Sequence, residues 1–289
     1  MFKKKKDQTY QSYWSISWNI FKKNKVAMVC LFIVILLCLI ALFAPLIAPY
    51  DPNKQVLTDR LMKPCGQHWF GTDDLGRDIF SRIIYGCRVS LSVGIISQII
   101  ATVIGYTMGV CAGYFGGKVD SVISFLIQEF SSFPFLLFAM AIMFVLGPGL
   151  INLYLALGLL GWASTARLIR GDVMRLKKME YIDACKVSGG NSFRIIMKHL
   201  LPNCLSTLIV TVTLGIPNAI MSEASLSFLG LGVKAPMASW GSMISFSQPY
   251  IRSATYYSVI PGLAIIITVL AFNMLGDGLR DALDPKLRS

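Results

Sequence analysis

The chain has 289 residues, of which 55% are hydrophobic and only 15% carry a charged side chain. A soluble domain has about 45–50% apolar and about 25% charged residues, so this composition excludes an ordinary soluble enzyme, a secreted disulfide scaffold and a disordered chain. The net charge of +12 is typical of membrane proteins with basic cytoplasmic loops, and it does not indicate nucleic-acid binding because no basic patch is interleaved with aromatic residues.

The N-terminal part predicts a cytoplasmic basic tail, one membrane span and an extracytoplasmic loop. Residues 1–25 are rich in lysine, and residues 26–50 carry no charge. This apolar stretch exceeds the roughly 7–15 residues of a signal-peptide core, so we expect an uncleaved first transmembrane helix. Residues 51–88 then form the extracytoplasmic loop. Within it, Leu75–Arg88 has apolar residues on one helical face, which favours an amphipathic interfacial helix over an ordered irregular loop.

Residues 89–279 predict a transmembrane core with spans two to six. The uncharged run from Phe130 to Ala166 would be about 55 Å long as one helix, too long for one crossing. The sequence Gly147-Pro148-Gly149 therefore predicts a turn between spans three and four. The expected spans are Val89–Gly117, about Ser121 to the glycine turn, the turn to Ala166, about Leu200 or Leu205 to Leu229, and about Tyr256–Gly276.

The distribution of basic residues predicts the orientation. With the N-terminus in the cytoplasm, the cytoplasmic tails and loops hold 19 of the 27 Lys and Arg residues. Cytoplasmic segments are enriched in these residues. We therefore expect an all-α polytopic membrane protein with six transmembrane helices, both termini inside, and a cytoplasmic tail at residues 280–289.

The loop between spans four and five, residues 167–203, is too basic to enter the bilayer but has helical periodicity. Apolar residues recur at helical spacing on both sides of residues 188–191, which read Ser-Gly-Gly-Asn. Asn191 or Ser192 is suited to cap a second helix. The pattern predicts a helix, a glycine turn, a second helix and then Pro202. Such a projecting helix fits a partner's groove, although an amphipathic hairpin on lipid headgroups has the same pattern.

This loop resembles the "EAA…G…I-LP" loop of ABC importer permeases. The matching residues are Asp183, Ala184, Cys185, Gly189, Leu201 and Pro202. Asp183 and Cys185 stand where Glu and Ala are usual, and His199 stands where Ile is usual, a form common in peptide permeases. The resemblance implies that the helix around Asp183–Gly189 is a coupling helix in a cleft of an ATPase subunit, kept short by a left-handed turn at Gly189.

Further segments resemble the C-type permease subunit of dipeptide, oligopeptide and nickel ABC importers. They are Phe70–Asp78 (FGTDDLGRD), Ser222–Gly232, Trp240-Gly241 and Asn273–Arg288. The resemblance covers nearly the whole chain and implies a multi-pass permease of the bacterial inner membrane. It favours peptides as the cargo. Nickel or a nickel chelate is the alternative, because Gln67-His68-Trp69 also suits a nickel permease.

The resemblance also implies the partners. They are a homologous second permease subunit, two ATP-binding subunits, an extracytoplasmic substrate-binding protein and membrane lipid. This chain has no Gly-x-x-x-x-Gly-Lys-Ser/Thr phosphate loop, the motif that cradles ATP phosphates. We therefore expect a transport subunit without enzymatic activity, with ATP and magnesium on the partner subunits and no cofactor on this chain.

Polar residues inside the predicted spans are candidates for the translocation pathway. Glu129 and Glu223 each cost about 2.5–3.5 kcal/mol to insert in a bilayer, which indicates a polar interior around them. Helical spacing predicts that Asn218 and Ser222 share a face with Glu223, and Gln128 lies beside Glu129. The alternatives are structural: Glu129 contacts the second permease, and Glu223 is hydrogen-bonded to bent backbone near Pro217.

Two other classes of protein are disfavoured. An intramembrane enzyme would need a nucleophile with a base, or metal ligands, within the spans, and neither histidine lies in the middle of one. A stand-alone channel would not need a loop that docks on an ATPase. The seven cysteines have irregular spacing and no C-x-x-C pair, so we expect neither a disulfide framework nor a metal site.

Overall fold

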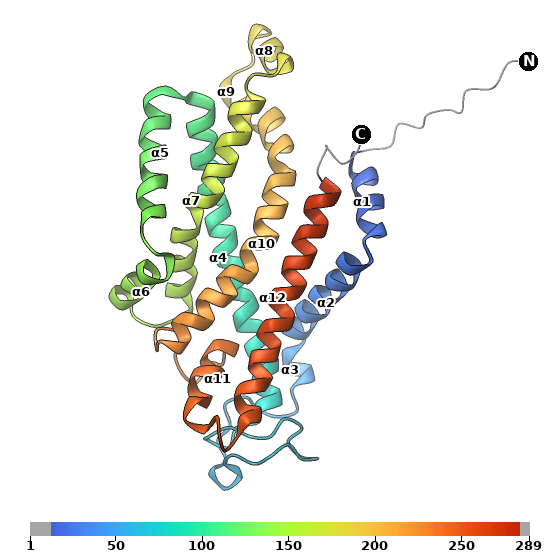
Figure 1. Cartoon of the computed structure of the whole chain (residues 1–289), viewed down its shortest axis with the longest axis vertical. Helices are drawn as coiled ribbons and strands as arrows, with labels where there is room; N and C mark the ends of the chain where they lie inside the picture. Colours follow the sequence, from blue (N-terminus) through green and yellow to red (C-terminus); the bar gives the residue numbers. More distant parts are fainter. Residues whose placement is uncertain (1–12, 284–289) are drawn as a thin grey trace, which may run out of the picture.

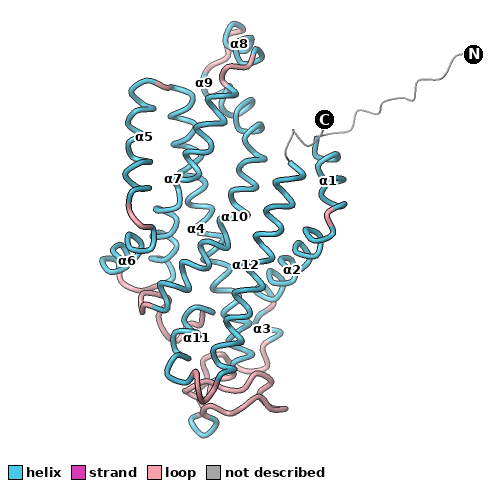
Figure 2. The backbone as a smooth tube through the Cα atoms, viewed as in Figure 1, coloured by secondary structure: helices cyan, strands magenta, loops and turns pink. Residues whose placement is uncertain are grey.

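The computed structural model describes residues 13–283, and regular secondary structure in that range is helical (Figures 1 and 2). The helices are α1 (Tyr13–Lys23), α2 (Lys25–Leu42), α3 (Ala44–Ile47), α4 (Ile79–Phe115), α5 (Gly117–Ser132), α6 (Phe135–Leu146), α7 (Leu150–Leu176), α8 (Glu180–Val187), α9 (Ser192–Ile195), α10 (Leu201–Phe228), α11 (Trp240–Ser247) and α12 (Thr255–Leu283). Short 3-10 helices lie at Leu57–Asp59 and Gln248–Tyr250, and a π-helical turn lies at Ile196–Leu200.

Figure 1 shows α2, α4, α5, α7, α10 and α12 running along the long axis of the molecule. Of these, α2, α4, α12 and the rod from α9 through α10 are long and apolar enough to cross a membrane. The α5–α6 pair, bent by 91°, is a fifth candidate. The expected all-helical polytopic fold is therefore present, with four or five candidate spans in residues 13–283 by length and composition.

The α4–α7 pair packs at backbone distance. Gly105, Gly109 and Gly113 recur every fourth residue on one face of α4, where a Cβ atom would lie 2.6–2.9 Å from atoms of α7. Any side chain at these positions would force the two helices apart, as at the small-residue interfaces of other membrane helices. Glycine is therefore what lets the long helix α4 lie directly on α7.

The predicted turn at residues 147–149 is present, and a second break was not expected. Gly147 ends α6 with φ of 79°. Phe133 and Pro134 also interrupt the helix, between α5 and α6. Proline has no backbone N–H and disfavours a helical conformation in the residue before it. The predicted third span is consequently two helices, of which α6 turns steeply away from α5 (Figure 1).

Two predicted boundaries differ from the structure. The amphipathic pattern of Leu75–Arg88 predicts a separate interfacial helix, but residues 79–88 are the first turns of α4, which is unbroken to Phe115. Their polar residues are not spread on a lipid surface, since Arg82 is buried. The predicted tail at residues 280–289 begins inside α12. Residues 1–12 of the predicted basic tail and residues 284–289 lie outside the described residues.

The fifth predicted span, about Leu200 or Leu205 to Leu229, corresponds to α10 (Leu201–Phe228), and the helix continues into it from α9. The π-helical turn joins α9 to α10, and the N–H of Leu201 donates to the carbonyl of Ile196, five residues back. This wider turn precedes Pro202, which lacks an N–H and is tolerated in the first turn of α10. One helical rod therefore connects the α8 loop to the opposite end of the molecule.

Candidate functional site

The loop after α7 contains the predicted helix, turn and helix. Ile182 of α8 and Ile195 of α9 are buried in one apolar cluster with Val173 of α7 and Val110 of α4. Leu201 packs against the same cluster. The loop is thus fixed to the ends of three long helices, and Figure 1 shows it at the end of the molecule where α1 and the C-terminal end of α12 also lie.

The turn after α8 is a Schellman motif. The N–H of Gly189 donates to the carbonyl of Lys186 at 3.0 Å, and the N–H of Gly190 donates to the carbonyl of Cys185 at 2.9 Å. Gly189 has φ of 78°, a left-handed conformation, while a Cβ atom there would meet nothing within 4 Å. Glycine is therefore favoured here by the left-handed backbone conformation and not by a lack of room for a side chain. Asn191 then caps α9 by accepting from the N–H of Arg194 at 2.8 Å.

The remaining residues of the motif are exposed or half-buried. Asp183 and Ala184 are exposed, Cys185 is half-buried, and Asp183 forms an ion pair with Lys186 at 2.8 Å. Beside them, Val187 is 89% and Phe193 72% exposed. The α8 loop thus presents an apolar surface beyond the bundle, whereas Leu201 and Pro202 lie at the base of the loop where α10 begins.

A groove of about 1640 Å³ runs along α7 and α10. Of the predicted pathway residues, Asn218 and Ser222 line it, together with Ser97 and Gln98 of α4. The charged side chains among its described lining residues are those of Arg175 and Arg280, near the C-terminal ends of α7 and α12. The deeper lining consists of apolar side chains, hydroxyls and amides.

Three predicted pathway residues lie outside this groove. Gln128 and Glu129 are exposed on α5 and are not among the residues that line it. Glu223 is fully buried in α10. The expectation that Glu223 shares a face with Asn218 and Ser222 is therefore wrong, because residue 223 is turned by about 100° from residue 222 on an α-helix.

Glu223 holds α10 against the segment before α11. Its Oε1 accepts from the hydroxyl of Ser227 at 2.6 Å and from that of Ser239 at 2.7 Å. Ser239 is also the N-cap of α11 and accepts from the N–H of Ser242 at 3.0 Å. The partners of Glu223 are thus two serines and not the backbone near Pro217. Sequence spacing identifies Ser227, four residues away, but not Ser239 in a different element.

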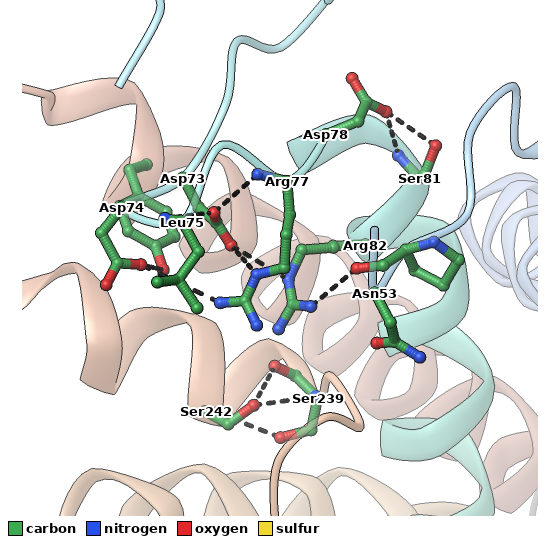
Figure 3. A network of polar contacts seen from close by, with 12 residues as sticks. Asn53, Asp73, Asp74, Leu75, Arg77, Asp78, Ser81, Arg82, Ser239 and Ser242 are labelled. Carbon is green, nitrogen blue, oxygen red and sulfur yellow. Dashed lines mark hydrogen bonds and ion pairs between the residues drawn. The ribbon is translucent and has the colours of Figure 1, made fainter. Parts of the chain in front are cut away.

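A buried polar cluster lies around the N-terminal end of α4 (Figure 3), which is the end of the molecule opposite α8 in Figure 1. Asp73 is fully buried, and its Oδ1 accepts from the N–H groups of Leu75 and Arg77, both at 2.9 Å. Its Oδ2 accepts from Nε of Arg77 at 2.6 Å and lies 3.5 Å from Nε of Arg82. Arg82 also donates to the carbonyl of Pro52 at 2.9 Å. Asp73 therefore forms ion pairs with two buried arginines at once.

The same cluster fixes α4 and α12. Asp78 caps α4 by accepting from the N–H and hydroxyl of Ser81, both at 2.7 Å, and contacts His68 at 2.9 Å. Asp74 accepts from the hydroxyl of Tyr257 in α12 at 3.1 Å. The sequence segment Phe70–Asp78 pointed only to a family resemblance and not to this cluster. Its mixture of acidic and basic residues was the one sequence signal of an ion-paired structure.

Two sequence families match the chain. Residues 102–289 match the family described as "Binding-protein-dependent transport system inner membrane component". The chain belongs to this family. Residues 12–64 match the "N-terminal TM domain of oligopeptide transport permease C". The permease is therefore an inner-membrane transport component of the C type, and it is a transport subunit, not an enzyme.

Characterised relatives align over nearly the full length of the permease. It is 46% identical to the dipeptide transport system permease protein DppC of Bacillus subtilis, over 96% of this chain and 87% of DppC. It is 42% identical to the oligopeptide transport system permease protein OppC of the same organism, over 96% and 91%. It is 41% identical to the glutathione transport system permease protein GsiD of Pectobacterium atrosepticum, over 98% and 95%.

A solved structure has the same fold. The inward-facing MetNI methionine ABC transporter aligns with a TM-score of 0.57 and 19% identity, over 71% of this chain and 98% of the matched chain. At this identity the likeness concerns the arrangement of helices alone. It is consistent with the helical core that α4, α7 and α10 form here.

Proposed function

We propose that this permease forms half of the translocation pathway of an ATP-driven importer of peptides. The relatives named above are permeases for dipeptides, oligopeptides and glutathione, which share peptide chemistry. The observation that carries the transport role is the α8 loop, which projects from the bundle and exposes Val187 and Phe193. Such a loop has no role in a permease that works alone.

The loop from Asp183 to Gly189 couples the permease to an ATPase subunit. A short helix with an apolar surface is suited to insert in a partner's groove, and Val187 is the most exposed apolar side chain of this loop. Because α8 packs on α7 and the α9–α10 rod, movement of the ATPase displaces both. Two ATP-binding subunits supply ATP and magnesium, and this chain binds neither.

The groove along α7 and α10 is the half of the pathway that this permease contributes. It is open along its length, and a homologous second permease covers it to complete the passage. An extracytoplasmic substrate-binding protein delivers cargo at the end closed by the Asp73 cluster. Asn218 and Ser222 face the passage, whereas Glu223 holds the wall in place.

The permease crosses the membrane six times with both termini in the cytoplasm. The crossing elements are α2, α4, the bent pair α5–α6, α7, α10 and α12. This topology is supported by Figure 1, in which α1, α8 and the C-terminal end of α12 lie at the same end of the molecule. Basic residues concentrate at that end, as the positive-inside rule requires. Cysteine accessibility at Lys186 and Lys234, one on each side of this arrangement, measures the orientation directly.

Uptake in cells that lack the permease tests the proposed function. The restored chain is compared with the empty vector, using a labelled dipeptide and radioactive nickel side by side. We expect the dipeptide to enter only with the permease restored, and nickel uptake to stay unchanged. Restored nickel uptake without dipeptide uptake would overturn the peptide assignment in favour of nickel or a nickel chelate.

A further inference from the structure

The centre of the groove has an unusual supply of hydrogen-bonding groups. Ser97 and Gln98 lie at the midpoint of α4, about 27 Å from its first residue at 1.5 Å per residue. Gly215 lies at the midpoint of α10. A Cβ atom at Gly215 would lie 2.1 Å from Oε1 of Gln98, so the amide of Gln98 rests directly on the backbone of α10. These residues therefore meet halfway along both helices.

Most hydrogen-bond donors at this depth are already used inside the helices. The hydroxyl of Thr211 donates to the carbonyl of Thr207 at 2.7 Å, and that of Ser222 donates to the carbonyl of Asn218 at 2.8 Å. The amide nitrogen of Asn218 donates to the carbonyl of Leu214 at 3.2 Å. The two hydroxyl protons and one N–H of Asn218 are therefore directed to the helix backbone, while the oxygen of each group retains lone pairs.

Gln98 has the same asymmetry. Its amide nitrogen donates to the hydroxyl of Thr102 at 3.3 Å and to the carbonyl of Thr211 at 3.5 Å. Within residues 13–283, its Oε1 accepts no hydrogen bond, although Gln98 is only 9% exposed. The buried hydroxyl of Ser97 beside it also has no partner there. A buried hydroxyl without a partner is costly, whereas Oε1 of Gln98 is not among the fully buried atoms and stays accessible to a molecule in the groove.

We infer that the oxygens of Gln98, Thr211, Asn218 and Ser222, here called the acceptor site, bind the N–H groups of cargo at the middle of the groove. Gln98 of α4 contacts Gly215, and the other three residues lie within about two turns of Gly215 on α10. All four line the groove. This inference rests on the proposed peptide-import function. The ligand is an N–H donor, either the amide of a peptide bond or the ammonium group of the N-terminus.

The absence of charge at this depth suits passage as well as binding. Among the described residues that line the groove, the charged ones are Arg175 and Arg280, near the C-terminal ends of α7 and α12. Neutral oxygens replace part of the water that an N–H group loses in the groove. Each hydrogen bond to such an oxygen is individually weak, so cargo can also leave.

The test compares two replacements of Gln98 in the full importer reconstituted in lipid vesicles, with its ATPase subunits and binding protein. Gln98→Met keeps the length of the side chain and removes the amide oxygen. Gln98→Glu keeps the length and retains acceptor oxygens. Gln128→Met, on the exposed face of α5 outside the groove, is the matched control. The readout is the initial rate of labelled-dipeptide uptake below saturation, per assembled importer.

We expect Gln98→Met to lower uptake about tenfold, Gln98→Glu to stay within about threefold of wild type, and Gln128→Met to leave the rate unchanged; tenfold corresponds to one lost hydrogen bond of about 1.4 kcal/mol. A dipeptide methylated at its peptide nitrogen identifies the donor. If the defect of Gln98→Met disappears with this cargo, the peptide N–H is bound, and if the defect persists, the ammonium group is bound.

Equal losses in Gln98→Met and Gln98→Glu would overturn the inference, because they would show a packing role alone. Wild-type uptake by Gln98→Met would overturn it as well. If Gln98→Met does not assemble, Asn218→Leu on the exposed side of α10 decides, with an expected loss of threefold or more. A wild-type importer that carries no peptide would overturn the proposed function together with the inference, whereas normal wild-type uptake separates the two.

Discussion

The hydroxyl of Ser239 donates to Oε1 of Glu223 at 2.7 Å and thereby joins the N-cap of α11 to α10 inside the protein. Ser227 donates to the same oxygen at 2.6 Å. Glu223→Ala leaves both hydroxyls without their acceptor, and we expect a loss of about 1–3 kcal/mol in unfolding free energy. Thermal unfolding of the purified permease measures it. Ser222→Ala, one residue away on the groove, should change stability by less than about 0.5 kcal/mol. Equal effects of the two replacements would contradict the role of Glu223.

Gly189→Asp should leave the permease in the membrane and abolish coupling to ATP hydrolysis. The left-handed backbone at Gly189 costs a larger residue about 1–2 kcal/mol, and relaxation of that strain opens the turn that ends α8. Gly230 is a matched control, since it has φ of 81° and free space around it but lies at the opposite end of α10. Cargo-stimulated ATPase activity and uptake are measured for both. Normal uptake with Gly189→Asp would refute the coupling role of the turn.

Val187→Asp should weaken association with the ATPase subunits by about tenfold or more. Val187 is 89% exposed, so an aspartate is tolerated in the isolated permease, but it would place a charge in an apolar contact of the complex. Ile251→Asp, 56% exposed at the other end of the molecule, is the control. Co-purification of ATPase with a tagged permease gives the readout. Full recovery with Val187→Asp would exclude this surface.

Gly109→Ala should destabilise the α4–α7 pair by about 1–3 kcal/mol, because overpacking at a fixed contact costs that much. The new Cβ would lie 2.7 Å from the carbonyl oxygen of Ala166. Gly171→Ala, on α7 with nothing within 4 Å, should instead be neutral or stabilising by up to about 1 kcal/mol. The thermal unfolding midpoints of the two variants are compared. A midpoint for Gly109→Ala at or above that of Gly171→Ala would contradict the close packing of α4 on α7.

Asp73→Ala should be the most damaging replacement in the cluster of Figure 3. It leaves the buried side chains of Arg77 and Arg82 without their shared carboxylate, at a cost of about 3–5 kcal/mol. Asp74→Ala removes a partly exposed carboxylate that accepts from Tyr257, and it should cost only about 1 kcal/mol. The amount of folded permease in the membrane is the measurement. Comparable amounts for both variants would show that Asp73 is not the centre of this cluster.

Sequence reasoning succeeded where structure depends on neighbouring residues. The turn at Gly189 depends on backbone conformation, and the cap at Asn191 depends on one local hydrogen bond. Both can be predicted from the residue type alone. The turn at Gly147 follows in the same way. The long helices were recognisable because about 20 consecutive apolar residues have few alternatives to a membrane span.

It failed where partners are distant in the chain. Ser239 is 16 residues from Glu223, so helical periodicity could not bring them together, and the acid was assigned to the wrong face. The continuity of α4 was missed because the polar residues Asp78 and Arg82 suggested an interface, although they are buried by partners from the preceding loop. The break at Pro134 was overlooked because the glycine turn at residue 147 already explained the excess length of the run.

The uninterrupted course of α4 has a consequence for motion. Its 37 residues reach about 55 Å. Arg82 lies near the ion-paired end, and Tyr114 lies near the other end, where its carbonyl accepts from Lys177 just after α7. Because α4 is unbroken and three of its glycines lie directly on α7, we expect it to move as one body. A tilt of α4 imposed near the junction of α7 and α8 therefore also moves its N-terminal end. Along α4, the two ends of the groove cannot move independently.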